Sequence, residues 1–218
     1  MGEDKTYYRR HLPHYQPSDA VFFVTFRLAE SIPKNVLKAL VDDPMEKGRL
    51  LMKGMHGRCR GELPKKYVDG YTAFLEKAKN GPHWLNNPAV AGLVAKEIHN
   101  LDDKLYSLIA YTIMPNHVHM VVDLREFEPK SDPQGDTQNN RFRLTRILRL
   151  LKGRTSRGAN QLLGRSGNFW HHESYDHVVR SGQELRRIID YVLYNAVAAG
   201  LANSPEDWKW SYVRKGYR

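Results

Sequence analysis

The chain has 218 residues, 41% of them hydrophobic, which is enough for one well-packed domain of mixed structure. It carries 34 Lys and Arg against 24 Asp and Glu, and this net charge of +10 favours an anionic polymer such as nucleic acid as its partner. No apolar run approaches the roughly 18 residues of a membrane span, and the single Cys59 excludes an internal disulfide, so we expect a cytoplasmic, nucleoid-associated protein.

The first part of the chain is predicted to contain one strand and several helices. Residues 1–18 include a polar, aromatic segment that we interpret as an arm lying on the fold. The apolar, β-branched run 21–28 predicts the first strand. A Gly- and cation-rich stretch at 45–66 reads as a surface insertion. Helical patterns are expected on either side of it, over residues 33–40, 67–78 and 88–103.

Two histidines stand at the start of a predicted central strand. Residues 105–114 and 117–122 are apolar runs separated by Pro115-Asn116, which predicts two strands joined by a turn. Side chains alternate between the faces of a strand, so His117 and His119 should share one face. Such a pair can begin a metal site, although it can equally be a hydrogen-bonded polar patch on the sheet. Two imidazoles alone leave a metal incompletely ligated.

The next helix is strongly basic. Residues 126–140 are rich in Pro, Gly and polar residues and predict a loop. From Arg141 to Arg165 there are eight cationic residues and no acidic one, interleaved with the apolar stripe of an amphipathic helix. Exposed helix faces usually mix charges of both signs, so a run of one sign favours phosphate binding. The candidate DNA-binding residues are Arg141, Arg143, Arg146, Arg149, Lys152, Arg154 and Arg157.

The last third predicts one more strand and one more helix. Residues 175–180 read as a strand, and Ser181 with Glu184 forms a capping box that opens a helix over 182–199, ended by Gly200. In total the pattern gives roughly four strands with interspersed helices. We therefore predict an α+β fold, a ferredoxin-like (RRM-like) sandwich with a central antiparallel sheet and helices on one face, in a single domain over residues 1–218.

Two residues of the last helix could complete a site around the histidines. Tyr191 and Asn195 are four residues apart and so share one helix face. An amide oxygen suits a hard cation beside two imidazoles, and a phenol can attack phosphorus to form a covalent intermediate. Spacing alone does not distinguish Tyr191 from the other tyrosines near predicted elements, Tyr194, Tyr175 and Tyr111.

The order of these motifs resembles that of the single-tyrosine HUH transposases. It runs from Pro115-Asn116-His117-Val118-His119 through the basic helix and Trp170 to residues 175–180 and 190–195. Residues 23–28 and 205–211 are similar to the branch associated with repetitive extragenic palindromes (REP). The resemblance covers nearly the whole chain except 45–66 and 126–140.

The resemblance implies roles for individual residues. His117 and His119 would be paired ligands of Mg²⁺ or Mn²⁺, Asn195 would contribute to the same ion, and Tyr191 would be the nucleophile. The substrate would be hairpin-bearing single-stranded DNA, cleaved to leave a 5′-phosphotyrosine and a free 3′-OH, with a monomer favoured over a homodimer. The chain departs from the family at Ala196, where a proline commonly follows the asparagine.

A second hypothesis is a non-catalytic protein that binds DNA or RNA hairpins and derives from such a transposase. A pure binding module has no need of the four site residues together. Other phosphate enzymes fit less well, because Val121 stands where a third histidine of an H-x-H-x-H run would be, and no H-E-x-x-H zinc motif occurs.

Overall fold

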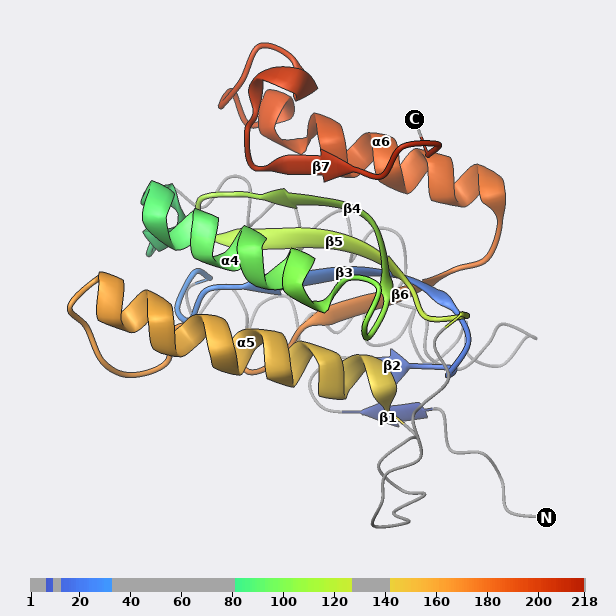
Figure 1. Ribbon diagram of the computed structural model, residues 1–218, viewed down its shortest axis with the longest axis horizontal. Helices are drawn as coiled ribbons and strands as arrows, with labels where there is room; N and C mark the ends of the chain where they lie inside the picture. Colours follow the sequence, from blue (N-terminus) through green and yellow to red (C-terminus); the bar gives the residue numbers. More distant parts are fainter. Residues whose placement is uncertain (1–6, 10–12, 33–80, 127–141, 218) are drawn as a thin grey trace, which may run out of the picture.

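The computed structural model describes residues 7–9, 13–32, 81–126 and 142–217, and its centre is an antiparallel β-sheet (Figure 1). Five strands form this sheet, with both partners of the long strand β3 distant from it in sequence. In spatial order they are β6 (Tyr175–Val179), β3 (Val21–Arg27), β5 (His117–Asp123), β4 (Ser107–Ile113) and β7 (Ser211–Val213).

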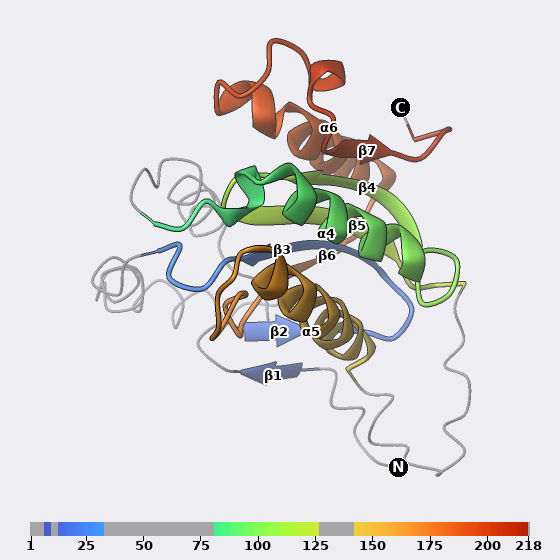
Figure 2. The same cartoon turned by 60° about the vertical axis from the view of Figure 1, so that its left-hand side comes forward.

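The two faces of the sheet are covered by different helices. Helices α4 (Pro88–Leu101) and α5 (Arg143–Leu162) pack on the face that carries Phe22, Val24 and Phe26 of β3. Helix α6 (Gly182–Ala198) packs on the opposite face, against Val21 and Phe23. Figures 1 and 2 show these layers, with α4 and α5 side by side and α6 across the sheet from them.

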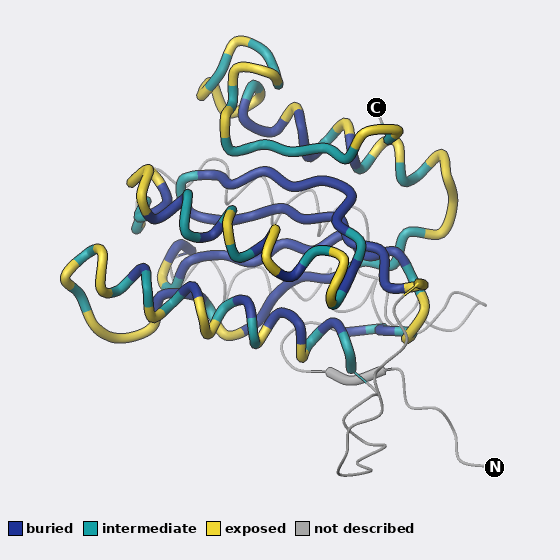
Figure 3. The backbone as a smooth tube through the Cα atoms, viewed as in Figure 1, coloured by how far each residue is buried: buried dark blue, intermediate teal, exposed yellow. Residues whose placement is uncertain are grey.

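The central strands are buried on both faces. All seven residues of β3 and of β5 are buried, because helices cover both sides of these central strands. In Figure 3 the central strands are dark throughout, whereas α5 alternates between buried and exposed positions. Gly158 allows α4 and α5 to approach closely, since a Cβ there would lie 2.7 Å from a methyl carbon of Leu93.

Local sequence signals explain where the helices begin. Asn87 caps α4, its side chain accepting a hydrogen bond from the Ala89 backbone N–H, and Pro88 occupies the first turn where no N–H partner is needed. Ser181 caps α6 by accepting from the Glu184 backbone N–H at 3.1 Å. The φ angle of +69° at Gly200 then allows the chain to leave α6.

A small N-terminal hairpin lies beside α5 and the edge strand β6 (Figure 2). It consists of β1 (Tyr7–Arg9) and β2 (Pro13–Tyr15). The imidazole of His14 is buried between the carboxylates of Asp176 and Glu173, and the Gln16 side-chain oxygen accepts hydrogen bonds from Thr145 of α5. Polar contacts therefore fix this segment to the sheet.

The α+β class and the central antiparallel sheet are confirmed, with two differences in detail. The expected layer of helices on one face holds for α4 and α5 but not for α6, which covers the other face. The sheet has five strands instead of about four, because the three-residue strand β7 is too short to carry an alternating pattern. A short 3₁₀ turn, η2 (Pro205–Asp207), precedes it, and another, η1 (Trp84–Asn86), precedes α4.

Several predicted segments lie outside the described residues. They are the helices at 33–40 and 67–78, the insertion at 45–66 and nearly all of the loop at 126–140. Residues 1–6 and 10–12 of the expected arm also lie outside the described residues. The other predicted strands and helices are confirmed, with ends that differ by a few residues. Within the described part of the chain, no helix combines the length and apolar character needed to cross a bilayer.

The cap of α6 gives a prediction about stability. Replacing Ser181 with Ala removes the acceptor for the Glu184 backbone N–H, so the free energy of unfolding should fall by about 1 kcal/mol. Ser181→Asp retains an acceptor at the cap and should keep wild-type stability in chemical denaturation. Equal loss in both variants would show that the cap hydrogen bond is not the cause.

The buried His14 gives a prediction about pH. Burial by itself lowers the pKa of His14, but hydrogen bonds and charge attraction from Asp176 and Glu173 outweigh it and raise the pKa to about 9. Because the folded pKa exceeds the ordinary value of 6.5, the protonated ring stabilises the fold fully below about pH 6.5. This stabilisation is lost as the pH rises towards 9.

The test compares wild type with His14→Gln in urea titrations from pH 6 to pH 9.5. The stability advantage of wild type should shrink across this window, and Asp176→Asn should reduce the same pH dependence. An advantage that stays constant from pH 6.5 to pH 9 would contradict the assignment.

Candidate active site

Strand β5 presents both histidines to the α6 face of the sheet. His117 and His119 are fully buried, and Val118 between them belongs to the core on the other face. The strand register sets His119 opposite Thr25 of β3 and opposite Thr112 of β4, and it sets His117 opposite Arg27. The alternation expected from the sequence therefore brings the two imidazoles onto one face.

The ring nitrogens of the pair converge. The Nε2 atoms of His117 and His119 are 3.0 Å apart. The Nδ1–H of His117 donates to the side-chain oxygen of Asn116 at 2.6 Å, and Nδ1 of His119 lies 2.7 Å from the hydroxyl of Thr25. Each imidazole is thus held through Nδ1, which directs its Nε2 towards the shared point.

Burial keeps both imidazoles neutral. It lowers the pKa of His117 to about 3. It also lowers the pKa of His119 well below its ordinary value, and the neighbouring His117 lowers it further. A neutral imidazole with a directed lone pair is the form that binds metal ions.

Helix α6 brings Tyr191 to the same point. The Tyr191 hydroxyl lies 3.3 Å from Nε2 of His119, within hydrogen-bond distance. The ring of Phe23 stacks on His119 at 5.5 Å between centroids and meets the edge of Tyr191 at 6.0 Å. Phe23 therefore supports both functional rings at once.

The other candidate tyrosines and Asn195 differ from Tyr191 in their surroundings. Tyr194 is 57% exposed, and Tyr111 is buried and stacks on Tyr212, so neither shares the surroundings of Tyr191. Asn195 is buried and lies one helical turn beyond Tyr191. Tyr175 is also buried and packs its ring edge against Phe23, which is a core contact.

The donor atoms at this point suit a divalent ion. Octahedral ligands at about 2.1 Å from an ion lie about 3.0 Å apart when adjacent, and this is the spacing of the two Nε2 atoms. Residues 7–9, 13–32, 81–126 and 142–217 contain no group of three or more His, Cys, Asp or Glu placed to hold a metal. An ion here would depend on the two imidazoles, on neutral oxygens such as that of Asn195, and on substrate or water.

The cations of α5 divide into two groups. Arg146, Arg149 and Arg157 are exposed and follow one another at spacings of three and eight residues along the helix. The others have protein partners, and Arg141 lies outside the described residues. Arg143 donates to the carbonyls of Leu124 and Leu105, Lys152 to those of His171 and His172, and Arg154 to the carboxylate of Glu97.

Sequence analysis missed the residues that orient the pair. Thr25 is the polar residue in an otherwise apolar strand centre. It is two residues from Phe23, so their side chains point to the same face of the strand. The sequence predicts Asn116 as a turn residue, and the structure adds that its side chain accepts a hydrogen bond from His117. A polar side chain inside a buried strand, or directly before a histidine strand, is the signal that could have identified them.

Comparison with known proteins agrees with the motifs. No family model matches the chain. A Haemophilus influenzae protein named for the REP-associated tyrosine transposases is 24% identical over 106 residues, covering 49% of this chain. The chain spans 58% of that relative's length. This relationship confirms the resemblance to the REP-associated tyrosine transposases that the order of motifs predicts.

A solved structure of a REP-associated tyrosine transposase bound to a REP hairpin is also similar. It shares 17% sequence identity with this chain, with a TM-score of 0.47. The similarity spans 97% of this chain and 82% of the solved chain.

The support of His119 by Thr25 gives a prediction about metal affinity. Thr25→Val keeps the side-chain shape but removes the hydroxyl, so Nδ1 of His119 loses its partner. Mn²⁺ affinity measured by calorimetry should fall about 10- to 100-fold. Thr25→Ser retains the hydroxyl and should bind Mn²⁺ nearly as wild type does. Unchanged affinity in Thr25→Val would exclude this orienting role.

Proposed function

We propose that the chain is a metal-dependent single-stranded DNA endonuclease and strand transferase, a transposase that acts on hairpin-bearing DNA through Tyr191. One observation carries the proposal: a phenol on α6 lies 3.3 Å from one of two buried, neutral imidazoles that converge at 3.0 Å. The relationship to the REP-associated tyrosine transposases supports it.

In the proposed reaction the Tyr191 oxygen attacks the phosphorus of a DNA phosphodiester. The new bond joins phosphorus to the phenolic oxygen, and the bond from phosphorus to the 3′ oxygen breaks. The phenolic proton is lost, and the departing 3′ oxygen takes up a proton to become a free 3′-OH. The 5′-phosphotyrosine keeps the energy of the phosphodiester, so that a later 3′-OH can displace Tyr191 and rejoin the strand.

The cofactor in this proposal is Mg²⁺ or Mn²⁺. His117, His119 and Asn195 would hold it, with the two imidazoles oriented through their Nδ1 atoms by Asn116 and Thr25. When bound, such an ion neutralises negative charge that develops on the phosphate oxygens. Phe23 packs on His119 and against the Tyr191 ring, and so would keep the phenol beside that imidazole.

The DNA partner fits the charge of the protein. The exposed arginines of α5 would contact phosphates without reading sequence, and the net charge of +10 adds long-range attraction. We propose that residues 1–218 form a single cytoplasmic, nucleoid-associated domain and that it acts as a monomer. Residues 1–18 would form its N-terminal arm, 45–66 an insertion and 126–140 a mobile loop.

The alternative is a hairpin-binding protein derived from a transposase that has lost catalysis. It would use the same basic helix but would not need Tyr191 beside a neutral imidazole pair. Binding to a DNA hairpin that survives alanine at His117, His119, Tyr191 and Asn195, without cleavage in any divalent metal, would favour this alternative.

The direct test is formation of a covalent protein–DNA adduct. A hairpin-bearing single-stranded oligonucleotide incubated with the protein and Mn²⁺ should yield an adduct that denaturing electrophoresis resolves. The adduct should be absent with EDTA and absent in Tyr191→Phe, because the attacking oxygen is then missing.

Tyr194→Phe is the matched control. It changes an exposed tyrosine on the same helix and should form the adduct as wild type does. An undiminished adduct in Tyr191→Phe, or its loss in Tyr194→Phe, would contradict the assignment of the nucleophile.

A further inference from the structure

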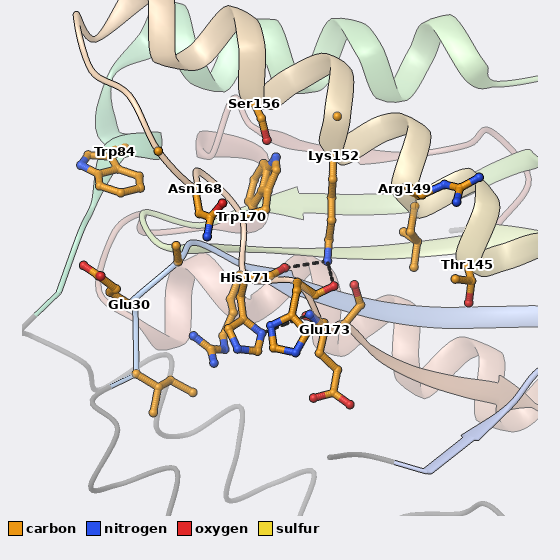
Figure 4. Close-up of a pocket in the computed structure, with 18 of the residues that line it drawn as sticks. Glu30, Trp84, Thr145, Arg149, Lys152, Ser156, Asn168, Trp170, His171 and Glu173 are labelled. Carbon is orange, nitrogen blue, oxygen red and sulfur yellow. Dashed lines mark hydrogen bonds between the residues drawn. The ribbon is translucent and has the colours of Figure 1, made fainter. Parts of the chain in front are cut away.

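A cavity of about 810 Å³ opens on the α5 side of the protein, within the size range of ligand pockets (Figure 4). Its walls come from α5, the strand β2, the turn at 29–32 and the segment 165–176. In Figure 4, Lys152 descends from α5 into it, and Thr145, Arg149 and Ser156 lie along the same helix. The cavity is separate from the point where Tyr191 meets His119, because α5 and α6 lie on opposite faces of the sheet.

Cations line the cavity from two directions. Arg149 and Lys152 come from α5, and Lys152 is positioned by its bonds to the carbonyls of His171 and His172. Arg165 comes from the segment that follows α5. Three acidic residues also line the cavity: Glu30, and Glu173 and Asp176, which pair with His14. The positive charge is therefore concentrated on the α5 and Arg165 side, where an anionic group of a ligand could bind.

A fixed planar stack forms part of the same wall. Trp84 stacks on Phe169 at 5.4 Å between ring centroids, and the guanidinium of Arg165 lies 3.7 Å over the Trp84 ring. Arg165 also donates to the Asn160 side-chain oxygen at 2.6 Å and to the Asn168 carbonyl at 3.4 Å. The guanidinium plane is thus held in place, and planar bases commonly stack on such planes.

The cavity reaches the strand ends that carry the imidazole pair. Arg27 lines it, is 2% exposed and lies directly opposite His117 in the β3–β5 register. Opposed residues of antiparallel strands are about 5 Å apart at Cα. Arg27 therefore links the wall of the cavity to the strand pair that carries His117, and both side chains are buried.

We propose that this cavity binds an unpaired nucleotide of the DNA strand, with its base stacked on Arg165 and its phosphate near Arg149 and Lys152. The assignment rests on the proposed function, since it takes the strand that Tyr191 would cleave as the ligand. Combined cations and a planar stack fit a nucleotide better than a simple anion, which has no flat surface to stack. The ring of His171 beside them is uncharged at neutral pH, because burial and Arg27 lower its pKa to about 4.

The test measures how much the bases, as distinct from the phosphates, contribute to binding. The probe is a fluorescent DNA hairpin with unpaired flanks of about eight dT nucleotides, compared with the same hairpin whose flanks are abasic. The two probes carry the same charge, so phosphate contacts cancel in the ratio of their Kd values. Wild type should bind the dT probe about ten-fold more tightly, the scale expected for one stacked base.

Three variants decide the assignment. Arg165→Ala and Arg165→Lys both lose the guanidinium plane, and Arg165→Lys keeps the charge, so both should bring the ratio close to one. Lys104→Ala is the control, because Lys104 is an exposed cation that follows the C-terminal end of α4, whereas Trp84 precedes its N-terminal end. This variant should keep the wild-type ratio. If Arg165→Ala fails to fold, Arg165→Lys alone decides.

The pocket is excluded if wild type shows no preference for dT flanks, or if both Arg165 variants keep the wild-type ratio. The adduct assay with the same dT probe reports separately on the proposed function. Adduct formation without a base preference would overturn the pocket and leave the nuclease proposal standing. A base preference that depends on Arg165, without any adduct, would support the pocket and overturn the nuclease.

Discussion

The antiparallel pairing of β3 with β5 is the constraint on which the rest of the structure depends. Its register sets Thr25 against His119 and Arg27 against His117, and it places Thr25 and both imidazoles on the α6 face. A slip of one residue would turn both imidazoles towards α4 and α5 and would remove the Thr25 hydroxyl from His119. The large apolar residues of β3 on the other face, such as Phe22 and Phe26, oppose such a slip because it would expose them to the polar site.

Much of this arrangement follows from the sequence, because strand and helix periods are local properties. The H-x-H spacing predicts that His117 and His119 share a face, and the spacing of four predicts that Tyr191 and Asn195 share one. An amphipathic pattern shows which side of a helix is buried but not which face of the sheet it covers, so the position of α6 could not be predicted. The role of Thr25 depends on a contact between residues 94 positions apart in the sequence, so it could not be predicted from local patterns either.

The two faces of the sheet divide the proposed function between them. The α6 face holds a small, buried and neutral site, where burial itself keeps the imidazoles in the form that binds a metal. The α5 face presents exposed arginines and the cavity, which would bind DNA without taking part in the cleavage reaction. Arg27 lies at the junction, since it lines the cavity and also pairs with His117 across the strands.

The central claim is that β5 and α6 create one cation site at which the Tyr191 phenol can act. Anomalous diffraction from crystals soaked in Mn²⁺ measures this most directly, because the signal locates the ion independently of any assay. The account predicts a single strong peak within ligand distance of Nε2 of both His117 and His119, on the side of Tyr191. A peak elsewhere, with none at the imidazole pair in a folded protein at saturating Mn²⁺, would contradict it.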